Sequence, residues 1–187
     1  GLVPAHGVSE RAIMPYNPAP IPPSVPPIDH APGMSVNPGV TRFFNRLVWL
    51  SRLTGGRLSS GDAVDRSGFN GAVNLVFAPS ADGTWHCLLS ENRFRFAKGR
   101  HENAIGTVTL ESDTFLRMLA GLTTYSTAEM TGKIRVEGEG HSTFVVSSII
   151  LQTRTQARET GPMGWIARSL IKSTLKKSAT GYEMDLS

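Results

Sequence analysis

The segment Gly138-Glu-Gly140-His-Ser-Thr143 is the part of the chain closest to a nucleotide-binding loop. A short strand-like run ending at Val136 precedes it, as a strand precedes the dinucleotide motif G-x-G-x-x-G. Thr143, however, takes the place of the third glycine, which lets helix and strand pack closely, and Glu139 would face the pyrophosphate. We therefore predict a glycine-bearing bend here and no phosphate site.

A partial metal motif occurs at His101-Glu102, which begins like the zinc-protease motif H-E-x-x-H. Ile105 replaces the second histidine, and a single histidine does not hold a catalytic zinc. The five histidines fall in separate regions, and the acidic residues lack the paired spacing of a general acid and base. We expect no metal, no cofactor and no catalysis by the chain itself.

The only cysteine, Cys87, follows His86. Neighbours in a strand point to opposite faces, so these two side chains cannot act as nucleophile and base. Cys87 alternates in phase with Trp85 and Leu89, which predicts a buried structural thiol. One cysteine allows no internal disulfide, and we expect a reducing, cytoplasmic location.

The length and charge of the chain bear on its domain count and on whether it binds nucleic acid or spans a membrane. The 187 residues suit one domain with some extra length, and a chain of this size buries roughly 70% of its unfolded surface without disulfides or metals. A net charge of +4 without a clustered basic patch argues against nucleic acid as a partner. The sequence has no apolar run of about 18 residues and no signal-peptide pattern, so we expect a soluble protein.

Residues 1–37 differ in composition from the rest, because nine of the twelve prolines lie there. Proline fixes φ and lacks an N–H, so we expect an extended or disordered segment outside the folded domain, which comprises residues 38–187. Its Pro-x-x-Pro spacings suit recognition by aromatic grooves, and the alternative is a tether along the surface.

Helical periodicity begins after Asn37-Pro38, an N-cap residue followed by proline at the first helical position. Trp49 lies on the polar side of this predicted helix, with Arg42 and Arg46, and Gly55-Gly56 ends the helix. The opposite face is apolar and comprises Val40, Phe43, Phe44, Leu47, Val48 and Leu50.

Alternating apolar residues then predict five strands. Residues 73–77, 85–89 and 94–96 form an antiparallel meander, and residues 108–110 and 134–136 mark the fourth and fifth strands. Between these last two, residues 112–121 form a short amphipathic helix that Ser112 or Asp113 caps and Gly121 ends.

The C-terminal third is less uniform. Residues 144–151 are rich in β-branched side chains, and an apolar run of this length fits either a strand or a helix. A break at residues 161–164 follows, and residues 165–177 form a last helix. Arg168, Lys172 and Lys176 make a basic stripe along one side of it.

The order of these elements, and the stretch from residue 104 to 144, resemble the sterol carrier protein 2 (SCP-2) family. A strand, an Asp-bearing short helix and a Gly-Lys step into the last strand occur in the family's order, and Gly138 looks like the glycine that closes this strand. The matching stretches are Gly106-Thr-Val-Thr-Leu110, Asp113-Thr-Phe-Leu-Arg-Met-Leu-Ala-Gly121 and Met130-Thr-Gly-Lys-Ile-Arg-Val-Glu-Gly138.

This resemblance implies an α/β domain of the α+β type, in which a five-stranded, mostly antiparallel sheet backed by helices encloses an apolar tunnel. Family members bind fatty acids, acyl-CoAs, sterols or phospholipids without covalent chemistry, and related bacterial domains are accessory factors in making lipidic quinones. We expect this chain to carry such a lipid, or an isoprenoid, or alternatively to act as a scaffold that presents lipidic intermediates to a biosynthetic enzyme.

Helical phase, strand phase and the family's element order select nine candidate lipid contacts. The alternative is that these side chains form an ordinary core. They are Phe115, Leu116, Leu119, Met130, Ile134, Val136, Phe144, Val145 and Ile149.

A second candidate surface is the last helix, where a basic stripe and an amphipathic ring suit transient contact with an anionic membrane. The alternative is that its apolar arc covers the core and its lysines are merely solvated. The residues concerned are Trp165, Arg168, Lys172 and Lys176.

Overall fold

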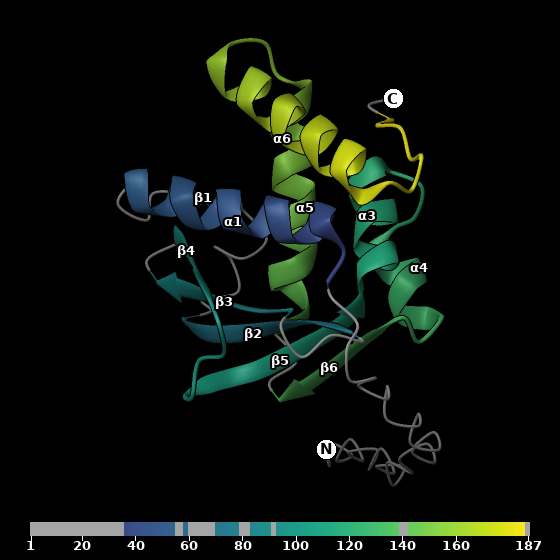
Figure 1. The fold of residues 1–187 in the computed structure, drawn as a ribbon. Helices are drawn as coiled ribbons and strands as arrows, with labels where there is room; N and C mark the ends of the chain where they lie inside the picture. The colour runs from purple at the N-terminus through teal and green to yellow at the C-terminus, as the bar shows by residue number, and fades with distance from the viewer. Residues whose placement is uncertain are drawn as a thin grey trace, which may run out of the picture.

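The computed structural model describes residues 36–54, 58–59, 70–78, 83–90, 93–138 and 142–185. Within these ranges the chain forms five helices and one six-stranded sheet in the order β1-β4-β3-β2-β5-β6 (Figure 1). The proline-rich segment predicted for residues 1–37 lies almost entirely outside them.

The sheet is built on an antiparallel meander of β2 (Gly71–Ala78), β3 (Thr84–Ser90) and β4 (Arg93–Lys98). β5 (Ala104–Glu111) pairs with β2 in parallel, and β6 (Ile134–Gly138) pairs with β5 in antiparallel. The five predicted strands and the mostly antiparallel sheet are thereby confirmed. A two-residue strand, β1 (Leu58–Ser59), extends the edge at β4, and two residues carry no alternation from which it could be predicted.

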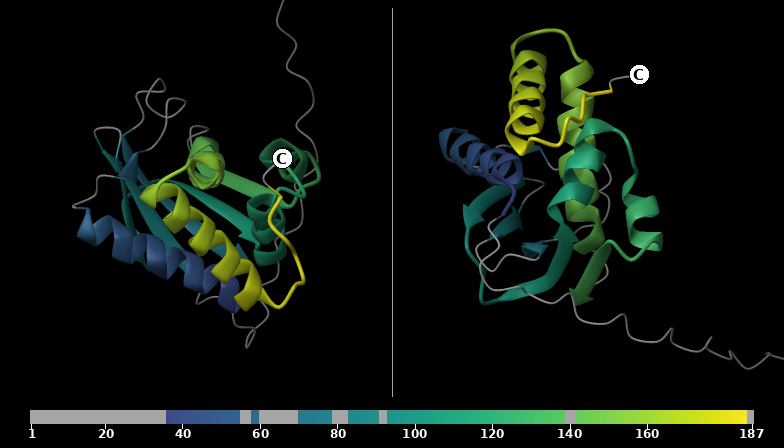
Figure 2. Two further views of the ribbon diagram at one scale, coloured as in Figure 1. Left: turned by 90° about the horizontal axis from the view of Figure 1, so that it is seen from above. Right: turned by 45° about the vertical axis from the view of Figure 1, so that its right-hand side comes forward.

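The helices form two layers over one face of the sheet (Figures 1 and 2). α1 (Pro38–Leu53), α3 (Ser112–Ala120) and α5 (Ser142–Arg158) lie against the strands, and α6 (Pro162–Ser178) crosses over α1 and α5. The short α4 (Tyr125–Met130) lies beside β6. This arrangement confirms the α+β fold class, and it leaves an apolar layer between the sheet and the first layer of helices.

The helix ends show which local signals decided the structure. The Asn37 side chain accepts a hydrogen bond from the Gly39 N–H at 2.8 Å, as the Asn-Pro signal predicted. The predicted capping of α3 by Ser112 or Asp113 is wrong, because β5 runs directly into the helix and Glu111 precedes it without a side-chain capping bond. Gly121 ends α3 in the left-handed conformation, at φ 90°.

Residues 144–151, which fitted either a strand or a helix, are helical and belong to α5. α5 packs against β5 on one side and α6 on another, so its buried residues include Val145, Val146, Ser148, Ile149 and Ile150. A helix buried on two sides needs apolar residues around more of its circumference. Tertiary packing therefore outweighs the strand preference of the β-branched side chains.

Candidate functional site

The layer between sheet and helices is filled with aromatic rings from elements far apart in the sequence. We call these rings, each at most 1% exposed, the aromatic cluster: Phe43, Phe44, Phe77, Trp85 and Phe115. Contacting pairs within it have ring centroids 5.1 to 5.8 Å apart. Such pairs stabilise a core beyond their buried area, by about 0.5–1.5 kcal/mol each.

A small opening in the protein surface lies next to this cluster. The opening has a volume of about 50 Å³, lies between α1, β4 and α5, and is called here the α1–α5 mouth. The Phe96 ring on its wall lies 6.4 Å from Phe44 of the aromatic cluster. Its lining is Leu47, Phe94, Phe96, Ile149, Gln152, Thr153 and Gln156. The mouth is thus apolar on its inner side and edged with neutral polar side chains.

The structure brings most of the predicted lipid contacts together in the core. These are Phe115, Leu116, Leu119, Ile134, Val145 and Ile149, with Val136 packed against them. Ile149 also lines the α1–α5 mouth. Two predicted contacts lie apart from this group, because Met130 at the end of α4 is 88% exposed and Phe144 in the first turn of α5 is 45% exposed. Ligand contact by any of the nine stays a prediction.

A second concavity, which we call the α3–α4–α5 groove, has a volume of about 360 Å³. Its lining is Met118, Gly121, Thr123, Thr124, Tyr125, Ser126, Ser147, Ile150, Leu151 and Arg154. Burial, followed by the charge of Glu129, raises the pKa of the Tyr125 phenol. The sequence analysis missed α4 and this groove, although Thr124 is a recognisable N-cap whose hydroxyl accepts from the Thr127 N–H at 3.2 Å.

Arg154, which lines the groove, is hydrogen-bonded to the protein backbone. Its guanidinium donates to the carbonyl oxygens of Leu119, at 3.3 Å, and Asp185, at 2.8 Å, and so joins α5 to the end of α3 and to the C-terminal segment. Burial is the main cause that lowers the pKa of Arg154, and the neighbouring Arg158 lowers it further.

The predicted membrane contacts separate into two groups. Trp165 is 67% exposed, and Lys172 and Lys176 are exposed beside it on α6. Arg168 instead donates to the carbonyl oxygens of Ala157 and Glu159, both at 2.8 Å, and so caps the C-terminal end of α5. Its charge is therefore engaged at the α5–α6 turn.

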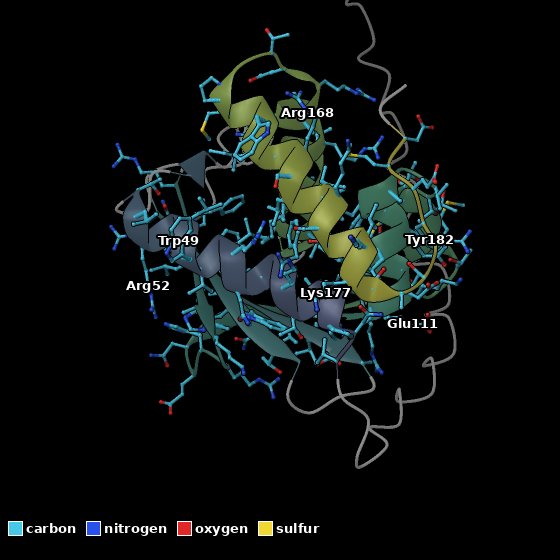
Figure 3. The ribbon with its side chains drawn as sticks, turned by 45° about the horizontal axis from the view of Figure 1, so that its top comes forward. Trp49, Arg52, Glu111, Arg168, Lys177 and Tyr182 are labelled. Atoms are coloured by element: carbon cyan, nitrogen blue, oxygen red, sulfur yellow. The ribbon has the colours of Figure 1, made fainter. Side chains whose placement is uncertain are left out.

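α1 completes this surface, which the sequence assigned to α6 alone. The two helices lie side by side, Arg46 donates to the Ser173 hydroxyl at 3.2 Å, and Trp49 on α1 is 59% exposed (Figure 3). α1 contains three arginines, α6 contains one arginine and three lysines, and neither helix contains an acidic residue. We call the exposed part the α1–α6 surface: Trp49, Arg52, Leu53, Met163, Trp165, Lys172, Lys176 and Lys177.

The residues that could support catalysis lie on opposite sides of the sheet. Cys87 is buried among the inward-facing core residues, and this burial raises the pKa of its thiol, as the strand phase predicted. On the other face, the His86 Nδ1 lies 3.0 Å from the Gly99 carbonyl oxygen, and the His86 and His101 ring centroids are 5.2 Å apart. In the part of the chain that the structure describes, no three or more histidine, cysteine or acidic side chains gather as a metal site would require. None of the described helices is long and apolar enough to cross a membrane.

No protein-family model and no curated protein matches the chain. Its structure is similar to the sterol carrier protein domain 2 of Helicoverpa armigera, with a TM-score of 0.46, 13% identity, and coverage of 71% of this chain and 99% of that one. It is also similar to sterol carrier protein 2 from Yarrowia lipolytica in its apo form, with a TM-score of 0.41, 18% identity, and coverage of 59% and 85%. For palmitated SCP2L2 from Aedes aegypti the TM-score is 0.40, the identity 22%, and the coverage 63% and 95%.

Proposed function

We propose that this chain binds a hydrophobic lipid in the apolar layer between the sheet and the helices, and carries it without changing it chemically. The supporting observation is the α1–α5 mouth, because its apolar wall adjoins the aromatic cluster through the contact of Phe96 with Phe44. Small-molecule sites are mostly apolar with a few polar groups that fix orientation, and the mouth has this composition. The ligand class is a fatty acid, acyl-CoA, sterol, phospholipid or isoprenoid.

Uptake requires the mouth to widen. Its volume of about 50 Å³ is well below the roughly 300–1,000 Å³ of a typical ligand pocket. α1 packs against α6, β4 and α3, and α5 packs against α6, β5, β6 and α3, with little direct contact between α1 and α5. Lipid uptake therefore separates these two helices at the mouth. Burying ten methylene groups contributes about 8 kcal/mol, which offsets the cost of opening and of ordering the lipid.

A bulky residue on the rim tests this route. We expect Gln152→Trp to weaken binding of a fluorescent fatty acid at least tenfold, because the indole occupies the mouth. Thr155→Trp is the matched control, since Thr155 is exposed on α5 and lines neither the mouth nor the groove. Native mass spectrometry of the purified protein detects co-purified lipid directly. Equal affinity of both folded variants and the wild type would place lipid entry elsewhere, and no uptake of any of these lipid classes would refute the proposed function.

The absence of catalysis is part of the proposal. The buried Cys87 has no histidine on its own face of β3, and His86 and His101 face the other side of the sheet. Incubation with a long-chain acyl-CoA should therefore release no free CoA above the buffer rate. Turnover that disappears in Cys87→Ala or His101→Ala would show that the chain is an enzyme.

We further propose that lipid exchange takes place at an anionic membrane, through the α1–α6 surface. Each basic residue near an anionic surface contributes about 1 kcal/mol, so Arg52, Lys172, Lys176 and Lys177 together give about 4 kcal/mol, a weak and salt-sensitive contact. The exposed Trp49 and Trp165 rings suit the headgroup level. In vesicle flotation we expect binding to anionic but not to neutral vesicles, and loss of it in Lys172→Glu with Lys176→Glu. Lys133→Glu, on a different exposed face, is the control.

The scaffold role is the second candidate function, and the α3–α4–α5 groove favours it. Exposed apolar side chains, including Met130, Phe144 and Leu151, lie on the two helices beside the groove, and such patches mark interaction sites. Leu151→Asp distinguishes the two roles. A carrier should transfer lipid between vesicles at the wild-type rate with this substitution, whereas a scaffold should lose its stimulation of a purified lipid-metabolising partner enzyme.

A further inference from the structure

The aromatic cluster contains one polar atom that the apolar layer does not satisfy. Trp85 is 1% exposed, and its indole Nε1–H finds no hydrogen-bond acceptor among the described residues. Its ring is stacked on Phe44 at 5.2 Å and meets Phe77 edge-on at 5.8 Å, and neither ring offers a hydrogen-bond acceptor in the plane of the indole N–H. A buried donor without a partner lowers the stability of the fold by about 1–3 kcal/mol, and such groups are uncommon in native structures.

A series of ring contacts joins the Trp85 indole to the wall of the α1–α5 mouth. Phe96 lines the mouth, Phe44 contacts Phe96, and Phe44 in turn stacks on Trp85. On β3 and β4 the partners in register are Cys87 and Phe96, so Trp85 is two residues further along the same face. The Phe44 ring is therefore the one side chain of this series that stands between the mouth and the Trp85 indole.

From this geometry we propose that Trp85 selects lipids that carry a hydrogen-bond acceptor in their buried part, such as a ketone, ester or carboxyl oxygen, over pure hydrocarbon chains. The inference rests on the proposed lipid-binding function and adds the chemical class of the ligand. A neutral acceptor suits the site because the described side chains that pack around Trp85 are apolar, and a lone buried charge is costly. The indole N–H donates to the lipid oxygen, and the rings of Phe44 and Phe77 pack beside it.

A competition between two lipids that differ only in the acceptor tests this. The full chain is equilibrated with a cyclodextrin-solubilised equimolar mixture of a long-chain methyl ketone and the straight-chain alkane of the same length. The protein is then separated by gel filtration, and the bound lipids are quantified by gas chromatography. We expect the bound ketone-to-alkane ratio to fall about tenfold from wild type to Trp85→Phe, which keeps a ring but removes the donor. Comparing ratios cancels the different solubilities of the two lipids.

Phe77→Leu is the matched control, because it loosens the same cluster without removing a donor. It should lower uptake of both lipids and leave their ratio at the wild-type value. A ratio that is unchanged in Trp85→Phe overturns the inference while leaving lipid binding intact. If the wild type takes up neither lipid, the inference fails, whereas the proposed function is decided separately by the fatty-acid binding and native mass spectrometry described above.

A measurement on the wild type covers the case in which Trp85→Phe does not fold. The chain has three tryptophans, and Trp49 and Trp165 are exposed, so Trp49→Phe and Trp165→Phe assign the three indole N–H signals in a ¹⁵N NMR spectrum. The Trp85 signal should move downfield with the ketone and not with the alkane. An identical response to both lipids contradicts the inference.

Discussion

Replacing Gly106 with alanine is expected to displace α5, the helix that carries Val145 and Ile149. Gly106 lies on the inner face of β5, directly beneath the first residue of α5. A Cβ built there would overlap the Ser142 Oγ, and would lie 2.9 Å from the Ser142 Cβ and 3.1 Å from the Glu137 carbonyl oxygen. Ser142 is fully buried, so its side chain cannot turn aside into solvent. The start of α5 must therefore move away from the sheet.

Overpacking of this kind costs about 1–3 kcal/mol. For a chain of this length each kcal/mol lowers Tm by about 2–4 °C, so we expect Gly106→Ala to lower it by about 2–12 °C. Because the overlap is with the Ser142 side chain, Ser142→Gly should relieve it. The double variant should therefore be more stable than the sum of the two single changes by about 0.5–3 kcal/mol, the coupling typical of residues in contact.

Thermal melts of both single variants and the double variant, followed by circular dichroism, measure this coupling. Thr107→Ala is the control, because Thr107 is the next residue of β5 and faces the other side of the sheet. Wild-type stability of Gly106→Ala, or strictly additive effects in the double variant, would refute the account of how α5 is seated on the sheet.

Two further predictions concern Arg154 and Cys87. Arg154→Met should lower the free energy of unfolding in a urea melt by about 1–3 kcal/mol, because the hydrogen bonds to the Leu119 and Asp185 carbonyl oxygens are lost, and should speed amide exchange at Asp185. Arg154→Lys should recover less than half of the lost stability. Slow exchange at Asp185 in Arg154→Met would contradict this. Burial raises the pKa of the Cys87 thiol, so on raising the pH the thiol ionises in the unfolded chain before it ionises in the folded one. The free energy of unfolding should therefore not depend on this thiol below about pH 8.5 and should fall as the pH rises above that value. Cys87→Ala should remove this contribution to the decline. Iodoacetamide should label Cys87 only after denaturation, and rapid labelling of the native protein would show that the thiol is accessible.

Local patterns were sufficient for the elements with one buried face. The alternation of Trp85, Cys87 and Leu89 placed all three side chains in the core, and the same phase placed His86 on the other side of the sheet. Likewise, the helical phase of α1 buried Phe43 and Phe44 and exposed Trp49. In such elements side chains are buried with the period of the backbone, about 3.6 residues in a helix and 2 in a strand.

Local patterns were insufficient where the neighbours of an element decide its environment. Met130 and Phe144 share the apolar character of the core residues, yet they lie at the end of α4 and the start of α5 and are 88% and 45% exposed. Arg168 has the spacing of a basic stripe, but the α5–α6 turn brings the Ala157 and Glu159 carbonyl oxygens to its guanidinium. The spacing of residues in the sequence specifies on which side of a helix a side chain lies, but the neighbouring elements that it meets there depend on the tertiary structure.

The sequence by itself determined the five principal strands, the amphipathic helices α1, α3 and α6, and the buried thiol. Only the tertiary structure decided that residues 144–151 are helical, that α1 and α6 lie side by side, and that the Phe44 ring contacts both Phe96 and Trp85. The physical reason is the range of the interactions. Caps, turns and alternation act between residues a few positions apart. The mouth, the groove and the aromatic cluster each join side chains from different helices or strands, which meet only when the sheet and the helices have assembled.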